Sequence, residues 1–340
     1  HYFSLIRNFR RHAWLLLYLF GASPAVCDCF VEGRVHHLKN LAKGTRYLPY
    51  ATSLRMGPLG YQSDAQSSLT VSYNDLSQYT KTLQEALKKP YPDYEAIGLK
   101  SSKDSHKQLN THLLQIENEF YSSIRPKRTT ATGETPLHAL AERGVEYVEV
   151  RCIDLNPLLP CGIDMQTMCF LDTFLLFCLL KDSPKTNNVE YALIPQNIDR
   201  TVYQGRDPEL KLLVGDSEIL LREWGQLLFD EMRPVADLLD SANQTNAYGQ
   251  AFNVMMLKLT DGGATPAAML LEEMRANGET YYAMAMRKAT EHRAYFQAKP
   301  PSAETTAKYR HLAEESLRRQ TEIEASDTLS FDDFLAGYYR

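Results

Sequence analysis

Residues 168–180 form a 13-residue apolar run that contains a single charged side chain, Asp172. A helix that crosses a bilayer needs about 20 apolar residues, so this run is too short to span a membrane. It is long enough for a helix buried inside a protein core. The run therefore predicts a buried helix in a soluble globular protein.

The sequence before and just after this run has mixed secondary-structure signals. Up to about residue 160, short strand-like runs and turns alternate with a few helices. Residues 74–88 have helical spacing, which Pro90 ends. Residues 181–200 are polar and irregular, which predicts a loop or a boundary between two parts of the chain.

From about residue 215 the pattern is mostly helical. Thr265 followed by Pro266 is typical of a helix start, and Gly278 after Asn277 is typical of a helix end. Residues 302–324 are rich in Ala, Glu, Arg and Leu and predict a further helix. Strands early in the chain and helices late in it indicate an α+β protein.

The first 25 residues resemble a secretory signal peptide, because arginines precede an apolar run at 13–20 and small residues follow it. Two observations favour an internal helix instead. The apolar run has 8 residues, at the low end for a signal peptide. The segment also opens on Tyr2 and Phe3 without a capping residue, as though it began inside a helix.

Charge and cysteine content narrow the class of protein. The formal net charge is -5, which argues against nucleic acid as a partner, since nucleic-acid-binding domains are usually basic. The six cysteines form no C-x-x-C pair, so a structural zinc site is not indicated. Cys169 and Cys178 lie in apolar sequence and read as buried, reduced residues. We expect a cytoplasmic protein with no membrane partner.

Residues 145–153 predict a strand with a polar face. Because side chains alternate along a strand, Glu149 and Arg151 share a face with apolar neighbours. One interpretation is a solvent-facing ion pair of little energetic weight. The other is a carboxylate that holds Mg²⁺ beside a guanidinium that contacts a phosphoryl oxygen.

Residues 113–121 predict a second strand, also with polar side chains on one face. Three cations, Arg125, Lys127 and Arg128, follow it around Pro126, which stiffens the backbone. Such a group suits a polyphosphate, but a solvated basic turn has the same sequence pattern.

A third segment, residues 47–55, is rich in tyrosine and ends at Arg55; Tyr61 follows after a glycine-containing turn. An arginine among tyrosines can bind a substrate carboxylate in a bidentate manner. The alternative is a core-facing turn whose arginine lies at the surface. The chain lacks the phosphate-binding G-x-x-x-x-G-K-[ST], the dinucleotide-binding G-x-G-x-x-G and the hydrolase G-x-S-x-G motifs, so no single common motif decides the function.

Five segments in order do point to a family. Together they resemble the type 1, proteobacterial group of glutamate–cysteine ligases, and the resemblance continues more weakly to about residue 330. The five segments are residues 18–25 (YLFGASPA), 47–55 (YLPYATSLR), 114–119 (LQIENE), 124–128 (IRPKR) and 146–151 (EYVEVR).

The resemblance implies a fold similar to glutamine synthetase, an antiparallel sheet curled into a bowl with helices outside. The chain would be the C-terminal two-thirds of a single catalytic domain, with a sheet-bearing active-site part at 1–200 and a helical part at 215–340. It also implies a reaction in which ATP phosphorylates the γ-carboxylate of glutamate and the amine of cysteine displaces phosphate, with Mg²⁺ (or Mn²⁺) as cofactor.

Site roles follow from the same resemblance. It makes Glu149 a Mg²⁺ ligand and Arg151 the residue that contacts the transferred phosphoryl group. It makes Arg55 a ligand for a substrate carboxylate and places Tyr61 in the cysteine pocket. Three further cations are implied to lie near the nucleotide phosphates: Arg125, Lys127 and Arg128.

Family members carry further metal-binding carboxylates in an N-terminal region that precedes the part resembled here. One carboxylate does not hold the Mg²⁺ ions of a phosphoryl-transfer site. We therefore expect this chain by itself to have little or no ligase activity. Two other hypotheses stay open: another carboxylate–amine ligase on the same fold, and a non-catalytic remnant. The sequence does not predict an oligomeric state.

Overall fold

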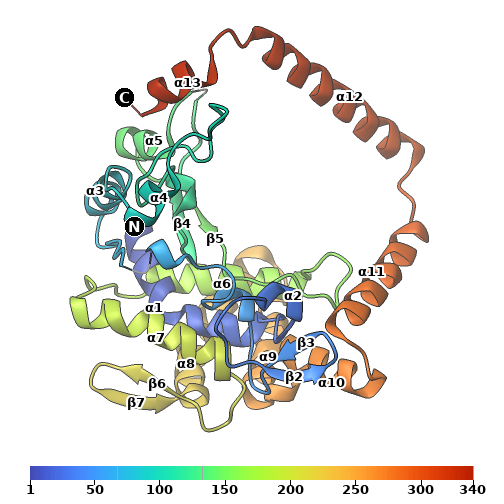
Figure 1. Ribbon diagram of the computed structural model, residues 1–340. Helices are drawn as coiled ribbons and strands as arrows, with labels where there is room; N and C mark the ends of the chain where they lie inside the picture. Colours follow the sequence, from blue (N-terminus) through green and yellow to red (C-terminus); the bar gives the residue numbers. More distant parts are fainter. Residues whose placement is uncertain (67, 132, 340) are drawn as a thin grey trace. The chain divides into compact units, whose positions relative to one another are not determined.

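The computed structural model describes residues 1–66, 68–131 and 133–339 (Figure 1). The chain divides into two compact units, His1–Lys288 and Ala289–Arg340. Within the described residues, the larger unit holds every strand and every buried core residue. The smaller unit is helical and its side chains are mostly exposed.

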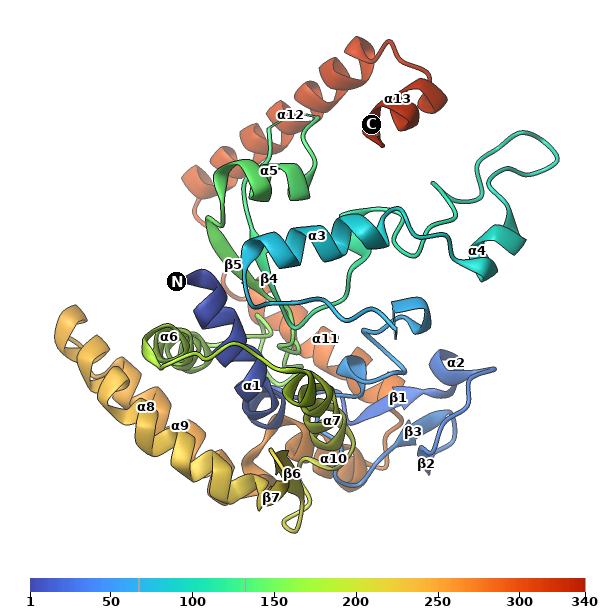
Figure 2. The same cartoon turned by 90° about the vertical axis from the view of Figure 1, so that its left-hand side faces the viewer.

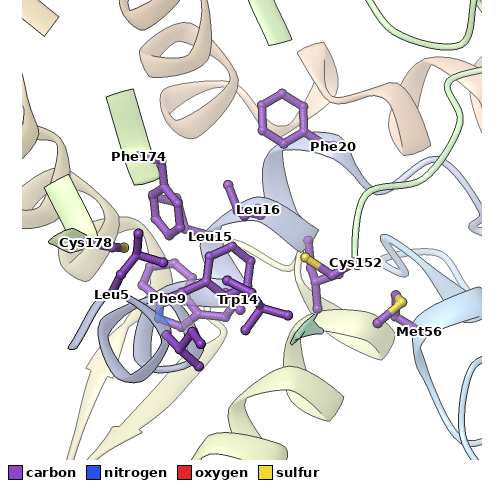
Figure 3. Packing of buried hydrophobic residues seen from close by; sticks show 14 of the residues in the cluster. Leu5, Phe9, Trp14, Leu15, Leu16, Phe20, Met56, Cys152, Phe174 and Cys178 are labelled. Atoms are coloured by element: carbon purple, nitrogen blue, oxygen red, sulfur yellow. The ribbon is translucent and has the colours of Figure 1, made fainter. Parts of the chain in front are cut away.

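The hydrophobic core is built around α1 (Tyr2–Phe20), whose side chains are almost all buried from Leu5 onwards (Figure 3). The second half of α1, residues 13–20, is apolar on all sides, and such a segment must be covered on all sides. α1 ends where Gly21 meets another segment. A Cβ at Gly21 would lie 2.5 Å from the carbonyl oxygen of Leu17 and 2.7 Å from the carbonyl carbon of Thr52, so this approach requires glycine.

Four further helices complete the core: α6 (Met165–Leu180), α7 (Asn188–Gln204), α8 (Leu221–Asn243) and α9 (Ala247–Thr260). Edge-to-face aromatic pairs join α1 to α6, with ring centroids 5.6 Å apart for Phe9 and Phe174 and 5.8 Å apart for Phe20 and Phe170. The helix predicted at 168–180 is therefore confirmed, but only one side of it is buried, because Met168, Leu179 and Leu180 are exposed. Figure 2 shows α6 beside α1.

In the residues that the structure describes, three small antiparallel sheets accompany the helices. The first has the order β1-β3-β2, and the other two are the pairs β4-β5 and β6-β7. Their bounds are β1 (Ala25–Cys27), β2 (Lys39–Ala42), β3 (Thr45–Tyr47), β4 (Ile124–Lys127), β5 (Tyr147–Val150), β6 (Lys211–Val214) and β7 (Ser217–Leu220). Helices with small antiparallel sheets fit the predicted α+β class, and the chain after β7 is mostly helical, as predicted.

Several predicted helix boundaries are confirmed. The helix predicted at 74–88 is α3, with Asp75 as its N-cap: the Asp75 side chain accepts from the N–H of Gln78. α10 starts at Pro266 and ends before Gly278, which is left-handed. The remaining elements are α2 (Asp28–Val31), η1 (Leu54–Met56), η2 (Asp64–Gln66), α3 (Leu76–Ala86), α4 (Pro92–Ile97), η3 (Glu117–Glu119), α5 (Pro136–Arg143), η4 (Gly262–Ala264), α10 (Pro266–Asn277), α11 (Tyr281–Gln297), α12 (Ala303–Ser326) and α13 (Phe331–Tyr338).

Two predictions are wrong. Residues 113–121 form no strand; they hold the short helix η3 and turns. Side chains there bond to nearby backbone and replace a strand ladder: Glu119 Oε2 accepts from the N–H of Gln115, and Gln115 Oε1 accepts from the N–H of Leu109. The prediction of a loop at 181–200 is wrong for residues 188–200, which belong to α7. The Asn187 side chain caps the start of this helix.

No helix in the described residues combines the length and the apolar character that crossing a membrane requires.

The buried His12 on α1 makes a stability prediction. Neither ring nitrogen has a hydrogen-bond partner among the described residues, and burial, with the nearby charges of Lys181 and Arg11, lowers the pKa of His12 from 6.5 to about 3. Below pH 6.5 the His12 side chain is therefore protonated in the unfolded chain but stays neutral in the folded chain. This part of the stability is present above pH 6.5 and is lost as the pH falls.

We expect the free energy of unfolding to fall between pH 6.5 and 5 by about 1.6 kcal/mol more than in His12→Leu, with a slope that approaches about 1.4 kcal/mol per pH unit. Urea unfolding of both proteins over this range measures the difference. Equal slopes would show that His12 takes up its proton inside the folded protein.

Candidate active site

The candidate site is centred on the paired strands β4 and β5 (Figure 1). Their register puts Arg125 opposite Glu149 and Lys127 opposite Tyr147. Residues directly opposite each other in an antiparallel pair share a face, so the side chains of alternate residues on both strands gather there. The ladder continues past β5, where the N–H of Arg151 donates to the carbonyl of Ser123 at 2.9 Å.

Glu149 lies between two cations on this face. Its Oε2 is 3.9 Å from Nζ of Lys127 and 4.0 Å from Nη1 of Arg151. Both distances exceed a hydrogen bond, and Oε2 is buried without a hydrogen-bond partner in the described residues. The side chain as a whole is 40% exposed. Glu149 is thus a reachable carboxylate with its hydrogen-bonding capacity unused, which is what a metal ligand requires.

Arg55 joins the cluster from η1. Its Nε donates to Oδ1 of Asp154 at 2.6 Å, and its Nη2 donates to the carbonyls of Arg151 at 3.3 Å and Ile153 at 3.0 Å. Nη1 has no hydrogen bond to the described residues. The guanidinium is therefore fixed on one edge and retains donors for a ligand on the other.

Asp154 holds Arg55 in place. Its side chain is 4% exposed, and its second oxygen accepts from the N–H of Ala22 and the hydroxyl of Ser23, each at 2.8 Å. A buried carboxylate is costly unless it is paired and hydrogen-bonded, and here both oxygens are used. Asp154 thereby connects the end of α1, η1 and the chain that follows β5.

Tyr61 is positioned by a tight turn after Arg55. The N–H of Tyr61 donates to the carbonyl of Arg55, and a Cβ at Gly60 would lie 2.0 Å from that carbonyl oxygen. Only glycine allows this closure. The Tyr61 ring then lies 5.1 Å from the guanidinium carbon of Arg151 and 5.8 Å from that of Arg55, distances at which a ring attracts a cation.

The other predicted cations are placed differently from one another. Lys127 lies beside Glu149, as above. Arg125 is buried and donates to the carbonyls of Asn118 and Phe120, so it holds that turn. Arg128 follows β4 and lies 4.0 Å from Glu146, away from Glu149. The structure thus brings together the side chains of five of the seven predicted residues, while those of Arg125 and Arg128 lie outside this cluster.

Sequence reasoning missed Asp154 and Tyr121. Asp154 falls on the strand face that carries Val150 and Cys152, and a carboxylate among apolar residues signals a buried partner. The Tyr121 ring packs edge-on against Tyr61 with centroids 4.6 Å apart, and no sequence pattern marks that contact.

Cys152 does not add a nucleophile to the site. Its thiol lies in the core (Figure 3), where burial raises its pKa to about 12. The thiol stays protonated at neutral pH and therefore unreactive. Groups of three or more His, Cys, Asp or Glu side chains arranged to hold a metal ion are absent from the part of the chain that the structure describes. Glu149 is the candidate ligand that remains.

Comparison with known proteins gives the family. The family model described as glutamate-cysteine ligase matches residues 1–201. The chain belongs to the glutamate–cysteine ligase family. Glutamate–cysteine ligases from Pseudomonas aeruginosa (strain UCBPP-PA14) and Saccharophagus degradans are each 48% identical to it, over 337 and 343 residues. These alignments cover 99% and 100% of this chain and 64% of each relative. The chain therefore spans slightly less than two-thirds of the length of these relatives.

Solved structures agree. The glutamate–cysteine ligase of Francisella tularensis, crystallised in complex with AMP, matches with a TM-score of 0.90 and 38% identity over 99% of this chain and 66% of that one. A bifunctional glutathione synthetase from Pasteurella multocida is 22% identical with a TM-score of 0.62, which indicates a shared fold only. The family resemblance seen in the sequence is therefore confirmed.

The role of Asp154 can be tested by Asp154→Asn. The amide keeps the shape but loses the charge that holds Arg55, and one of its two positions can only donate. We expect the free energy of unfolding to fall by about 2–3 kcal/mol. Urea denaturation measures it. Asp216→Asn, the same change in the exposed β6-β7 turn, should stay within about 0.5 kcal/mol of wild type. Equal effects of the two substitutions would contradict the assigned role.

Proposed function

We propose that this chain carries part of the active site of an ATP-dependent ligase that joins the γ-carboxylate of glutamate to the amine of cysteine. The product is γ-glutamylcysteine, and the reaction is the first step of glutathione biosynthesis. The observation that carries the proposal is the cluster of Glu149, Lys127, Arg151, Arg55 and Tyr61 in a member of the glutamate–cysteine ligase family.

The chemistry requires charge neutralisation and positioning. A carboxylate acylates an amine only after one of its oxygens becomes part of a leaving group, and phosphorylation by ATP supplies that leaving group. The transferred phosphoryl group carries negative charge that fixed cations stabilise. Arg151 contacts this group, with Lys127 beside it. ADP is the leaving group of this phosphorylation. The cysteine amine nitrogen then attacks the acyl carbon, the bond from that carbon to the phosphate oxygen breaks, and phosphate leaves while the amine loses a proton to water.

Arg55 binds a substrate carboxylate through its uncommitted Nη1. Tyr61 lines the cysteine pocket, and its ring limits the positions of both guanidinium groups. Arg125 acts indirectly, because its guanidinium holds the 118–120 turn. Arg128 lies beside Glu146 and would have to move away from it to contact a nucleotide phosphate. We therefore place Arg128 farthest from the transferred phosphoryl group among the predicted cations.

A divalent cation fits Glu149 as one ligand among several. Mg²⁺ takes six oxygen ligands and usually keeps several waters. Glu149 offers one unused carboxylate oxygen, and ATP offers phosphate oxygens. We propose that Mg²⁺ (or Mn²⁺) binds here, neutralises phosphate charge, and takes its further carboxylates from the length of the relatives that this chain does not span. The AMP complex of the Francisella tularensis relative supports a nucleotide site in the family.

Three further parts of the proposal concern the setting. The sheets are proposed to belong to a glutamine-synthetase-like bowl, with the active-site part at 1–200 and helical support at 215–340. The protein is proposed to act in the cytoplasm, which suits the buried thiols Cys152, Cys169 and Cys178. Its partners are proposed to be the small molecules glutamate, cysteine and ATP, without nucleic acid or membrane.

Activity provides the test. With ATP, Mg²⁺, glutamate and cysteine, this chain alone should form little or no dipeptide, because one carboxylate is insufficient for the metal site. A chimaera in which the Pseudomonas aeruginosa relative supplies the length that this chain does not span should be active. In that chimaera, Glu149→Gln should lower kcat by about 100-fold or more. Dipeptide formation measured by chromatography gives both results.

The matched control is Glu142→Gln, the same substitution at an exposed position of α5, and it should leave kcat unchanged. Robust dipeptide formation by the chain alone would contradict the incomplete metal site. An active chimaera that tolerates Glu149→Gln would remove Glu149 from the mechanism. Ligation of another amine in preference to cysteine would replace the proposed substrate.

A further inference from the structure

A cavity of about 340 Å³ lies between α1, α7 and two segments near residues 56–73 and 120–123. α1 and α7 pack side by side (Figure 2). Aromatic and apolar side chains line the cavity, Tyr61, Tyr73, Tyr191 and Ile194 among them, and uncharged polar side chains such as Gln62 lie beside them. Among the described residues that line it, Arg10 of α1 is the only one that is charged at neutral pH.

The neighbouring arginines of α1 are fully engaged by the protein. Arg7 donates to the carbonyl of Asn74 at 2.8 Å and to that of Ser183 at 2.9 Å. Arg11 pairs with Glu190, to which its Nη2 donates at 2.9 Å. Both guanidinium groups therefore stabilise the packing of α1 against the chain around residues 74 and 183–190.

Arg10 differs from both. Its guanidinium carbon lies 4.3 Å from the ring centroid of Tyr73 and 5.6 Å from that of Tyr191. It has no hydrogen bond and no ion pair with the described residues. Glu190 of α7, the helix that packs beside α1, is paired with Arg11. Two aromatic faces thus hold a cation in a cavity while its N–H donors remain unused.

The cavity offers a second unused polar group. The Tyr61 hydroxyl is buried and has no hydrogen-bond partner among the described residues. The Tyr73 hydroxyl differs, because it hydrogen-bonds that of Ser122 at 2.6 Å. A buried polar group without a partner costs free energy, which a ligand that bonds to it recovers.

We propose that this cavity binds a small amphipathic monocarboxylate. The carboxylate pairs with the Arg10 guanidinium, whose planar set of donors matches two oxygens. The apolar body packs between Met56 and Ile194. Glu149, Arg151 and Arg55 do not line the cavity, so it is distinct from the phosphoryl-transfer cluster, although Tyr61 and the Tyr121 ring that packs against it are among the lining residues. The inference does not depend on the proposed ligase activity.

Octanoate is a suitable probe, with octanamide as its uncharged counterpart. Ligand-observed NMR titrations of the 340-residue chain measure both affinities. We expect octanoate to bind wild type at least about tenfold more tightly than Arg10→Gln, since the substitution removes a charge-assisted pair. Octanamide should bind weakly and equally to both. Arg319→Gln, the same change on the exposed α12, is the matched control and should bind octanoate as wild type does.

Ile194→Trp tests the cavity without touching α1. The larger side chain fills the space, so octanoate binding should be lost while the far-ultraviolet circular dichroism stays that of wild type. If Arg10→Gln does not fold, Ile194→Trp still tests whether octanoate binds in the cavity. The proposal is overturned if folded wild type does not bind octanoate, if Arg10→Gln binds it equally well, or if Ile194→Trp leaves its binding unchanged.

Discussion

The buried carboxylate of Asp154 is the contact on which the candidate site depends. One oxygen holds Arg55, and the other holds the backbone at Ala22 and the hydroxyl of Ser23. Three segments far apart in sequence therefore meet at one side chain. Replacing such a group with apolar residues need not destabilise a protein, but removing one partner leaves an unpaired charge. We interpret Asp154 as fixing the relative position of these segments more than adding net stability.

The position of Arg55 sets that of Tyr61 and is linked to that of Arg151. Arg55 donates to the Arg151 carbonyl, and its own carbonyl accepts from the N–H of Tyr61. The turn between them closes only because residue 60 is glycine. The Tyr61 ring lies near both guanidinium groups, so a displacement of Asp154 would reach every substrate contact proposed for this face.

The core supplies the rigid support for this arrangement. α1 ends at Gly21, in contact with Thr52, and the end of α7 meets the same residue: a Cβ at Gly205 would lie 2.7 Å from the Thr52 side chain. The Thr52 hydroxyl donates to the carbonyl of Thr201 at 2.9 Å. Two helix ends thus clamp the segment that leads to Arg55, and small residues allow the close approach.

Much of this could be predicted from the sequence, for physical reasons. The apolar run of α6 and the Thr-Pro start of α10 are local signals, and the structure confirms the helix that each of them predicts. Alternation along residues 145–153 placed Glu149 and Arg151 on one face, which the structure bears out by their 4.0 Å approach. The strand predicted at 113–121 failed because Gln115 and Glu119 bond to nearby backbone, a preference that alternation does not reveal. The separation of Arg125 from Arg128 depends on tertiary contacts with the 118–120 turn and Glu146, which a run of basic residues does not encode.

A double-mutant cycle of Asp154→Asn and Arg55→Gln tests the central claim most directly. The free energies of unfolding of wild type, both single variants and the double variant give the coupling between the two side chains. If Asp154 holds Arg55 as described, the coupling should be at least about 1 kcal/mol, as for a charge-assisted hydrogen bond. Effects that add to within about 0.5 kcal/mol would contradict it and would remove Asp154 as the residue that positions Arg55.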